Sequence, residues 1–370
     1  MTLSFRWYGP SDPVTLDAIR QIPGVRGIVS ALHDVLPGEA WTEDAVYGLR
    51  QRVEATGLAV SCIESIPVPE GIKLGTAERD RLTETWCASV EAVGKALSGG
   101  EFAPVVCYNF MPVFDWTRTD LRRQRQDGSE ALAYVESELS EVEHALASGG
   151  LPGWMDAHSP DDLRRLFAAY ADVSQDQMWD HLGWFLERTA PVAEAAGVKL
   201  AIHPDDPPWP LFGLPRVVTS AEAFDTVCDL VDSPANGVTF CTGSLGADPA
   251  QATGLPSAAA RLAGRGRVHF AHLRNVRQLG NGRDFTETAH SPHVEGGGDV
   301  DMPGVIAALK GAGFDGPLRP DHGRQIWSER QGGPGGLSVR PGYGLYDRAL
   351  GATYLQGLWE ATHVSPASSV

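Results

Sequence analysis

Residues 267–274 read Arg-Val-His-Phe-Ala-His-Leu-Arg, a short and largely apolar run that ends in ionisable side chains. Short apolar runs of this kind predict buried β-strands. Seven further runs have the same character and are separated by segments with helical patterns, namely residues 3–8, 27–32, 59–65, 103–109, 199–203, 237–242 and 317–321. Eight strands that alternate with helices predict an α/β protein with a (β/α)8 fold, the TIM barrel.

The segments between these runs carry helix signals. Thr42 precedes two acidic residues and an apolar stripe with helical spacing, which is typical of a helix N-terminus. Thr219 and Glu222 have the spacing of a capping box before a second stripe of this kind. Helices with one apolar face would cover the outside of a barrel.

The connection after the fourth run is far longer than a single crossover helix requires. We predict an inserted, helical, lid-like segment at about residues 111–190, because loops that follow the carboxyl ends of barrel strands build active sites. The whole of residues 1–363 is expected to form one catalytic domain. Residues 364–370 are expected to form a flexible tail.

Composition excludes several classes of protein. The 370 residues contain 30 Lys and Arg against 47 Asp and Glu, a net charge of −17, so no basic surface for nucleic acid is expected. No run approaches the roughly 18 uninterrupted apolar residues of a membrane helix, and the first residues lack an apolar signal core. The five widely spaced cysteines fit neither a disulfide framework nor a Cys-x-x-Cys zinc motif. We expect a cytoplasmic protein without nucleic-acid or membrane partners. If the protein forms an oligomer, we expect a homodimer.

Four consecutive runs end in metal-ligand types: His203, Cys241, His272 and Asp321. Because the carboxyl ends of barrel strands converge on one rim, these side chains are expected to share a single cation. Two imidazoles, a thiolate and a carboxylate suit a divalent transition metal, whereas Mg²⁺ and Ca²⁺ prefer oxygen ligands. Zinc fits the ligand types, and Mn²⁺ or Fe²⁺ fits better if the ion keeps open positions for a chelating substrate.

Taken singly, each of these side chains is more often structural, since a lone buried cysteine usually belongs to the core. Their joint occurrence at four successive strand ends favours a metal site. The earlier strand ends add polar groups to the same rim, as a polyhydroxylated ligand would require. The candidate substrate contacts are Arg6, Trp7, His33, Glu64, Tyr108 and Asn109.

Several contiguous sequence motifs resemble those of the mannonate dehydratases, metal-dependent TIM-barrel lyases of hexuronate breakdown. Contiguous motifs of this length are more specific than a spaced glycine pattern, and they are distributed along almost the whole chain. They include RWYGP at residues 6–10, CYNFMPV at 107–113, DWTRTDL at 115–121, HPDDPP at 203–208, CTGS at 241–244 and RPDHG at 319–323.

The resemblance implies that the four strand-end ligands hold one ion, commonly Mn²⁺ with Fe²⁺ as the alternative. It implies dehydration of D-mannonate to 2-keto-3-deoxy-D-gluconate. The acid and base residues would fall on His322 and Tyr343, with Asp321 in a second, catalytic role, and the division of roles stays open. Arg274 follows a metal ligand and is a candidate bidentate partner of the substrate carboxylate.

Two other functions remain as alternatives. A metal-dependent sugar or sugar-acid isomerase or epimerase could use similar ligands on the same barrel, and a sugar-acid binding paralogue could keep the pocket without turnover. Product analysis separates the three functions. A lyase releases water and a 2-keto-3-deoxy acid, an isomerase conserves mass, and a binding protein forms no product.

Overall fold

Eight parallel strands close into a barrel in the order β1-β12-β9-β8-β7-β4-β3-β2, which confirms the predicted TIM barrel. The structure is a computed structural model that describes residues 1–148, 159–280, 282–331, 336 and 338–363, so the predicted tail at 364–370 lies outside the described residues. Each predicted run overlaps one barrel strand, with β1 and β8 beginning one residue before their runs: β1 Thr2–Arg6, β2 Gly27–Ser30, β3 Ala59–Glu64, β4 Val105–Tyr108, β7 Lys199–Ile202, β8 Asn236–Cys241, β9 Val268–Leu273 and β12 Pro317–Pro320.

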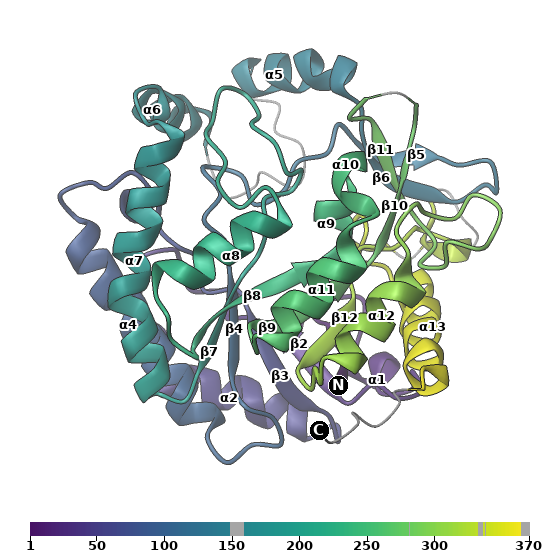
Figure 1. The fold of residues 1–370 in the computed structure, drawn as a ribbon, viewed down its shortest axis with the longest axis horizontal. Coiled ribbons are helices and arrows are strands. Elements are labelled where there is room, and N and C mark those ends of the chain that lie inside the picture. Colours follow the sequence, from purple (N-terminus) through teal and green to yellow (C-terminus); the bar gives the residue numbers. More distant parts are fainter. Residues whose placement is uncertain (149–158, 281, 332–335, 337, 364–370) are drawn as a thin grey trace, which may run out of the picture.

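Helices surround the strands (Figure 1). The α-helices are α1 Leu16–Ile19, α2 Glu43–Glu54, α3 Glu70–Lys73, α4 Arg79–Leu97, α5 Leu139–Ser148, α6 Pro160–Tyr170, α7 Gln175–Ala195, α8 Ala221–Leu230, α9 Thr242–Gly246, α10 Pro249–Ala252, α11 Leu255–Gly264, α12 Met302–Gly311 and α13 Tyr346–Ala361. Short 3₁₀ turns lie at Glu136–Glu138 and Trp327–Glu329. Within the described part of the chain, no helix has the length and apolar character needed to cross a membrane.

Helix capping follows the sequence closely at one of the two predicted sites. Thr42 precedes α2, and its side chain accepts a hydrogen bond from the Ala45 amide. At α8 the cap lies one residue later than predicted: Ser220, not Thr219, has the extended backbone of an N-cap, and its Oγ accepts from the Ala223 amide. Both caps satisfy an amide that the first helical turn would leave unpaired.

A second sheet lies at the end of the barrel where α5 lies, at the upper right of Figure 1. Its four strands are antiparallel in the order β10-β11-β6-β5, with bounds β5 Asp120–Gln124, β6 Glu130–Tyr134, β10 Asn275–Gln278 and β11 Phe285–Thr288. The segment after β4 is therefore not wholly helical as predicted, because it contributes the β5–β6 hairpin to this sheet. The rest of the sheet comes from the loop after β9.

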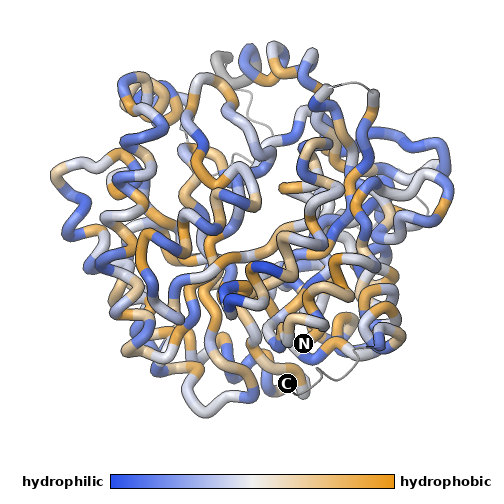
Figure 2. Tube along the Cα trace, viewed as in Figure 1, coloured by the Kyte–Doolittle hydropathy of each residue, from blue (hydrophilic) through white to orange (hydrophobic). Residues whose placement is uncertain are grey.

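Apolar side chains fill the barrel and its helical shell, and hydrophobic stretches alternate with hydrophilic ones along the outer helices (Figure 2). Cys62, Cys107 and Phe270 belong to a small cluster inside the barrel. Inward and outward positions alternate along a strand, so residue 272 faces the same side as Phe270. This places the chemistry at the end of β9 above a packed apolar floor.

Candidate active site

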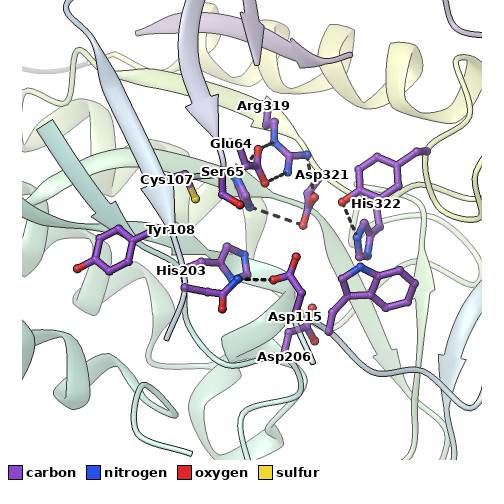
Figure 3. Close-up of a pocket in the computed structure, with 14 residues that line it drawn as sticks. Glu64, Ser65, Cys107, Tyr108, Asp115, His203, Asp206, Arg319, Asp321 and His322 are labelled. Carbon is purple, nitrogen blue, oxygen red and sulfur yellow. Dashed lines mark hydrogen bonds and ion pairs between the residues drawn. The ribbon is translucent and has the colours of Figure 1, made fainter. Parts of the chain in front are cut away.

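A cavity opens where the carboxyl ends of the barrel strands meet (Figure 3), the end at which TIM-barrel enzymes carry their active sites. Strand ends and the loops that follow them supply its lining. The lining residues are Glu64, Ser65, Cys107, Tyr108, Asn109, Asp115, Trp116, His203, Asp206, His272, Arg319, Asp321, His322 and Tyr343.

The four predicted metal ligands come together at this rim. Ligand atoms of His203, Cys241 and His272 all lie within 4.8 Å of one another. Asp321 Oδ2 lies 3.8 Å from Cys241 Sγ and 3.8 Å from His272 Nδ1. The imidazole rings of His203 and His272 have their centroids 5.0 Å apart. One cation could therefore contact nitrogen, sulfur and oxygen donors from four neighbouring strands.

Strand register brings these donors to one level. Cys241 at the end of β8 pairs directly with His272 on β9, and His272 pairs with Arg319 on β12. Asp321 follows the end of β12, and its ion pair with Arg319 at 2.8 Å holds its carboxylate beside His272 and Cys241. His203 follows β7, and its amide donates to the Tyr108 carbonyl at 2.7 Å. The hydrogen-bond ladder of the barrel thus fixes the positions of the donors.

The donor atoms have the electrostatics of a cation site. Burial alone would raise the pKa of the Cys241 thiol, but Arg274 and His203 hold that pKa well below its ordinary value, so the thiolate is favoured. Burial alone would lower the pKa of His203, but the Cys241 thiolate and Asp321 raise it to about 9. Both nitrogens of His272 are buried, and neither has a hydrogen-bond partner in the part of the chain that the structure describes. An orphaned imidazole beside a thiolate and a carboxylate fits a divalent transition metal.

Buried arginines surround the cluster and keep its carboxylates ionised. Arg319 Nη1 lies 2.8 Å from Asp321 Oδ1, and Arg274 Nε lies 2.9 Å from Asp321 Oδ2. Burial alone would raise the pKa of Asp321, but Arg319 lowers it well below the ordinary value. Arg274 also pairs with Asp206 and Glu287, and Arg118 bridges the same two carboxylates. This network joins the segment after β4 to the loops after β7 and β9.

His322 and Tyr343 form a hydrogen-bonded pair in the cavity wall (Figure 3). His322 Nε2 lies 2.9 Å from the Tyr343 hydroxyl. On the other side of the ring, Nδ1 lies 3.3 Å from both Glu287 Oε1 and Arg274 Nη1. Burial, with Tyr8 and Asp321 nearby, raises the pKa of Tyr343 well above its ordinary value. The phenol therefore keeps its proton at neutral pH.

The predicted substrate contacts divide into two groups. Glu64 and Asn109 line the cavity. Tyr108 belongs to its wall, but its ring is fully buried and packs against Trp86 and Phe185, pointing away from the other labelled residues in Figure 3. The remaining predicted contacts do not line the cavity: Arg6, Trp7, His33 and Arg274.

Each of these four residues has a different environment. Trp7 is buried in the main core. Arg6 lies over the Tyr8 ring at 4.5 Å, and His33 packs against the same ring. Arg274 has no exposed surface, and its guanidinium faces the carboxylates of Asp206, Glu287 and Asp321, so it is turned toward buried partners and away from a substrate carboxylate.

Several cavity residues were not predicted from the sequence. Asp115 follows β4, and Figure 3 shows its carboxylate pointing toward His203; Asn109 Nδ2 donates to its Oδ1 at 2.7 Å. Burial raises the pKa of Asp115. Its position within DWTRTDL, just after a strand end, is a signal that could have identified it. Arg319 precedes a predicted ligand by two residues, and the same face rule could have identified it. Glu287, which contacts His322 without lining the cavity, carries no such signal.

A family model described as D-mannonate dehydratase (UxuA) matches residues 1–368. Among curated proteins, "Mannonate dehydratase 2" of Halalkalibacterium halodurans is 46% identical over 361 residues, covering 98% of this chain and 99% of that protein. "Mannonate dehydratase" of Streptococcus uberis is also 46% identical, covering 98% of both.

Solved structures give the same picture. Mannonate dehydratase from Streptococcus suis serotype 2 superposes with a TM-score of 0.85 at 42% identity, covering 100% of this chain and 99% of that one. D-psicose 3-epimerase from Clostridium cellulolyticum H10 covers 99% of this chain with a TM-score of 0.55 at 12% identity, a likeness that extends to the fold alone.

Proposed function

The chain belongs to the D-mannonate dehydratase family, and we propose how its own residues perform the reaction of this family. The enzyme is a hydro-lyase. It removes a hydrogen from C2 and the hydroxyl from C3 of D-mannonate, and the resulting enol becomes 2-keto-3-deoxy-D-gluconate with release of one water. The reaction needs a base for the weakly acidic C2 proton, an acid for the departing hydroxyl, and stabilisation of the charge that develops between these steps.

His203, Cys241, His272 and Asp321 would hold the metal that the family requires. We propose Mn²⁺, with Fe²⁺ as the alternative, because a substrate that chelates the ion needs open coordination positions. When bound, the ion would supply Lewis acidity to the carboxylate end of the substrate.

The charge of the cavity supports a requirement for a cation. Four carboxylates line it, and one guanidinium does so among the described residues: Glu64, Asp115, Asp206 and Asp321 against Arg319. A sugar acid is itself an anion. Even with His203 protonated, carboxylates outnumber the cationic groups of the lining, so the lining alone would repel the substrate. We infer that substrate binds only to the metal-loaded protein.

His322 is the proposed base and Tyr343 the proposed acid. The raised pKa of Tyr343 keeps its phenol protonated, which suits a donor to the C3 hydroxyl and not a base. His322 Nε2 lies on the cavity side of its ring, within 2.9 Å of that phenol, and would accept the C2 proton. Glu287, close to Nδ1, would hold the ring in this orientation. Asp321 would act through its charge beside both groups.

Asn109 and Asp115 are the proposed contacts for the sugar hydroxyls. They form one hydrogen-bonded unit, and the side chain of Asp115 keeps a second oxygen that can accept from a hydroxyl. The lid role of the segment at 111–190 stays a prediction, as do the homodimer and the cytoplasmic location.

The observation that carries this function is the meeting of four donor side chains at the barrel rim, three of which line the same cavity as the His322–Tyr343 pair. The test is incubation of metal-stripped protein with D-mannonate, with and without Mn²⁺, followed by mass spectrometry of the product. Loss of one water from the substrate, only with Mn²⁺, is expected. An isomer of unchanged mass would favour the isomerase alternative, and binding without turnover would favour the binding paralogue.

A further inference from the structure

His272 is the only ligand of the proposed set whose ring nitrogens both lack a hydrogen-bond partner within the described residues. His203 is different, because its Nδ1 lies 2.7 Å from the Pro204 carbonyl. A carbonyl only accepts, so His203 Nδ1 carries the hydrogen and its Nε2 is left for a metal. For His272, side-chain carboxylates and not a backbone carbonyl face the ring nitrogens.

Two carboxylates face the two nitrogens of His272. Asp321 Oδ2 lies 3.8 Å from Nδ1, on the side of Cys241, and Glu64 Oε2 lies 3.6 Å from Nε2. Only one nitrogen of a neutral imidazole carries hydrogen. If Nδ1 coordinates a cation, the hydrogen must lie on Nε2. Glu64 Oε2 faces that nitrogen at 3.6 Å, so a hydrogen bond requires the two atoms to approach by a few tenths of an ångström when the cation binds.

Glu64 is held rigidly for this task. Arg319 pairs with it in a bidentate manner, with Nη2 2.8 Å from Oε1 and Nε 3.1 Å from Oε2. Strand register supports this geometry, because Arg319 on β12 pairs with His272 on the neighbouring strand. The side chain of Arg319 is 1% exposed and that of Glu64 is 17% exposed. The carboxylate therefore cannot turn away from the imidazole without breaking a buried ion pair.

We propose that Glu64 is a positioning residue of the metal site: its carboxylate accepts the Nε2 hydrogen of His272 and so presents Nδ1 to the cation. This inference rests on the ligand set of the proposed function. It assigns to Glu64 a role other than the substrate contact predicted from the sequence. Carboxylates that orient a ligating histidine in this way commonly change metal affinity by about 10- to 100-fold.

A second cation is the competing explanation. Ligand atoms of Glu64, Cys107 and His272 also lie within 4.8 Å of one another. Both oxygens of Glu64 are already paired with Arg319, whose charge would repel a cation there. Cys107 Sγ lies 3.3 Å from the Thr239 hydroxyl and belongs to the apolar cluster inside the barrel. These contacts favour one cation with a supporting carboxylate.

The test is titration of the metal-stripped full-length protein with Mn²⁺, following free Mn²⁺ by electron paramagnetic resonance. Glu64→Gln is expected to bind one Mn²⁺ about 10- to 100-fold more weakly than the unmodified protein. Cys107→Ser is the matched control. Cys107 belongs with Glu64 and His272 to the group that would hold a second cation, but it has no part in the proposed single site. The Mn²⁺ affinity of this variant is therefore expected to be unchanged. Glu64→Asp keeps the negative charge beside Arg319 and is expected to lose less Mn²⁺ affinity than Glu64→Gln. This second variant tests the proposal if Glu64→Gln does not fold.

The outcomes separate the inference from the function on which it rests. Equal Mn²⁺ affinity of folded Glu64→Gln, with only KM for mannonate raised, would overturn the positioning role and make Glu64 a substrate contact. Two Mn²⁺ per chain, reduced to one by Cys107→Ser, would establish the second cation site instead. If Cys241→Ser still binds Mn²⁺ as the unmodified protein does, the proposed ligand set itself fails.

Discussion

His269 and His272 lie three residues apart on β9, yet they occupy opposite faces of the barrel wall and opposite chemical environments. His269 Nδ1 lies 2.6 Å from the Leu200 carbonyl, and burial lowers the pKa of His269 to about 4, so the ring stays neutral. Within the described residues, the ring nitrogens of His272 have no hydrogen-bond partner, and the Cys241 sulfur and two carboxylates lie around the ring. Face and level along a strand, not residue type, decide which histidine is structural and which is available to a ligand.

Making the same substitution at both histidines is the most direct test of the difference between His269 and His272. His272→Gln is expected to lose bound Mn²⁺ and to lower activity about a thousandfold, since Lewis-acid stabilisation is worth several kcal/mol. His269→Gln is expected to keep its metal. Metal analysis and steady-state kinetics measure both, and circular dichroism checks the fold.

Cys241→Ser tests the same cluster from the neighbouring strand and is expected to behave like His272→Gln. Full activity in either metal-free variant would remove the metal site from the mechanism. Loss of metal from His269→Gln would mean that a substitution on one face of β9 disturbs the metal site on the other face.

A smaller effect is expected beyond the metal cluster, at the His-Tyr pair. His322→Asn and Tyr343→Phe are each expected to lower kcat by about a hundredfold or more, because general acid-base groups commonly contribute about 10² to 10⁴. Their Mn²⁺ content should stay normal, which would extend the comparison to a third kind of residue at the rim: one that acts without holding metal. An unchanged kcat in either variant would exclude that residue from proton transfer.

The smallest expected effect concerns stability at the structural histidine. The pKa of His269 is about 4 when folded and near 6.5 when unfolded, so the unfolded chain binds a proton first as the pH falls. The stability contributed by the neutral ring is therefore complete above pH 6.5 and is lost progressively towards pH 4. Between pH 7 and pH 5 the unmodified protein should lose about 2 kcal/mol that His269→Gln does not lose.

Urea unfolding of both proteins at the two pH values measures this difference. The free-energy gap between them should narrow at pH 5. If the difference in unfolding free energy between the two proteins is the same at both pH values, the pKa of His269 is not lowered by folding. The contrast between His269 and His272 would then depend on their contacts alone.

The sequence was informative wherever a function depends on strand position. The eight runs predicted the barrel because buried parallel strands are short, apolar and separated by helices. Convergence of strand ends then predicted that His203, Cys241, His272 and Asp321 would meet, and the structure places them together. These inferences needed only local pattern and the topology of one fold.

Long-range pairing could not be predicted in this way. β5 reads Asp-Leu-Arg-Arg-Gln, a charged edge strand without apolar alternation, so nothing local marks it as part of a sheet. Arg274 looked available to a substrate because its partners are distant in sequence: Asp206 lies after β7 and Glu287 lies in β11. Glu287 itself becomes relevant only when the second sheet brings it beside His322.

The pairing of Cys241 with His272, and of His272 with Arg319, has a consequence for engineering. These groups are placed by the ladder of the barrel, whereas Asn109, Asp115 and Tyr343 are carried by loops. Loop exchange could therefore alter which sugar acid is accepted while the coordinating atoms stay where they are. Inserting or deleting a single residue within β8 or β9 would be far more damaging, because it would turn a donor to the outside of the wall.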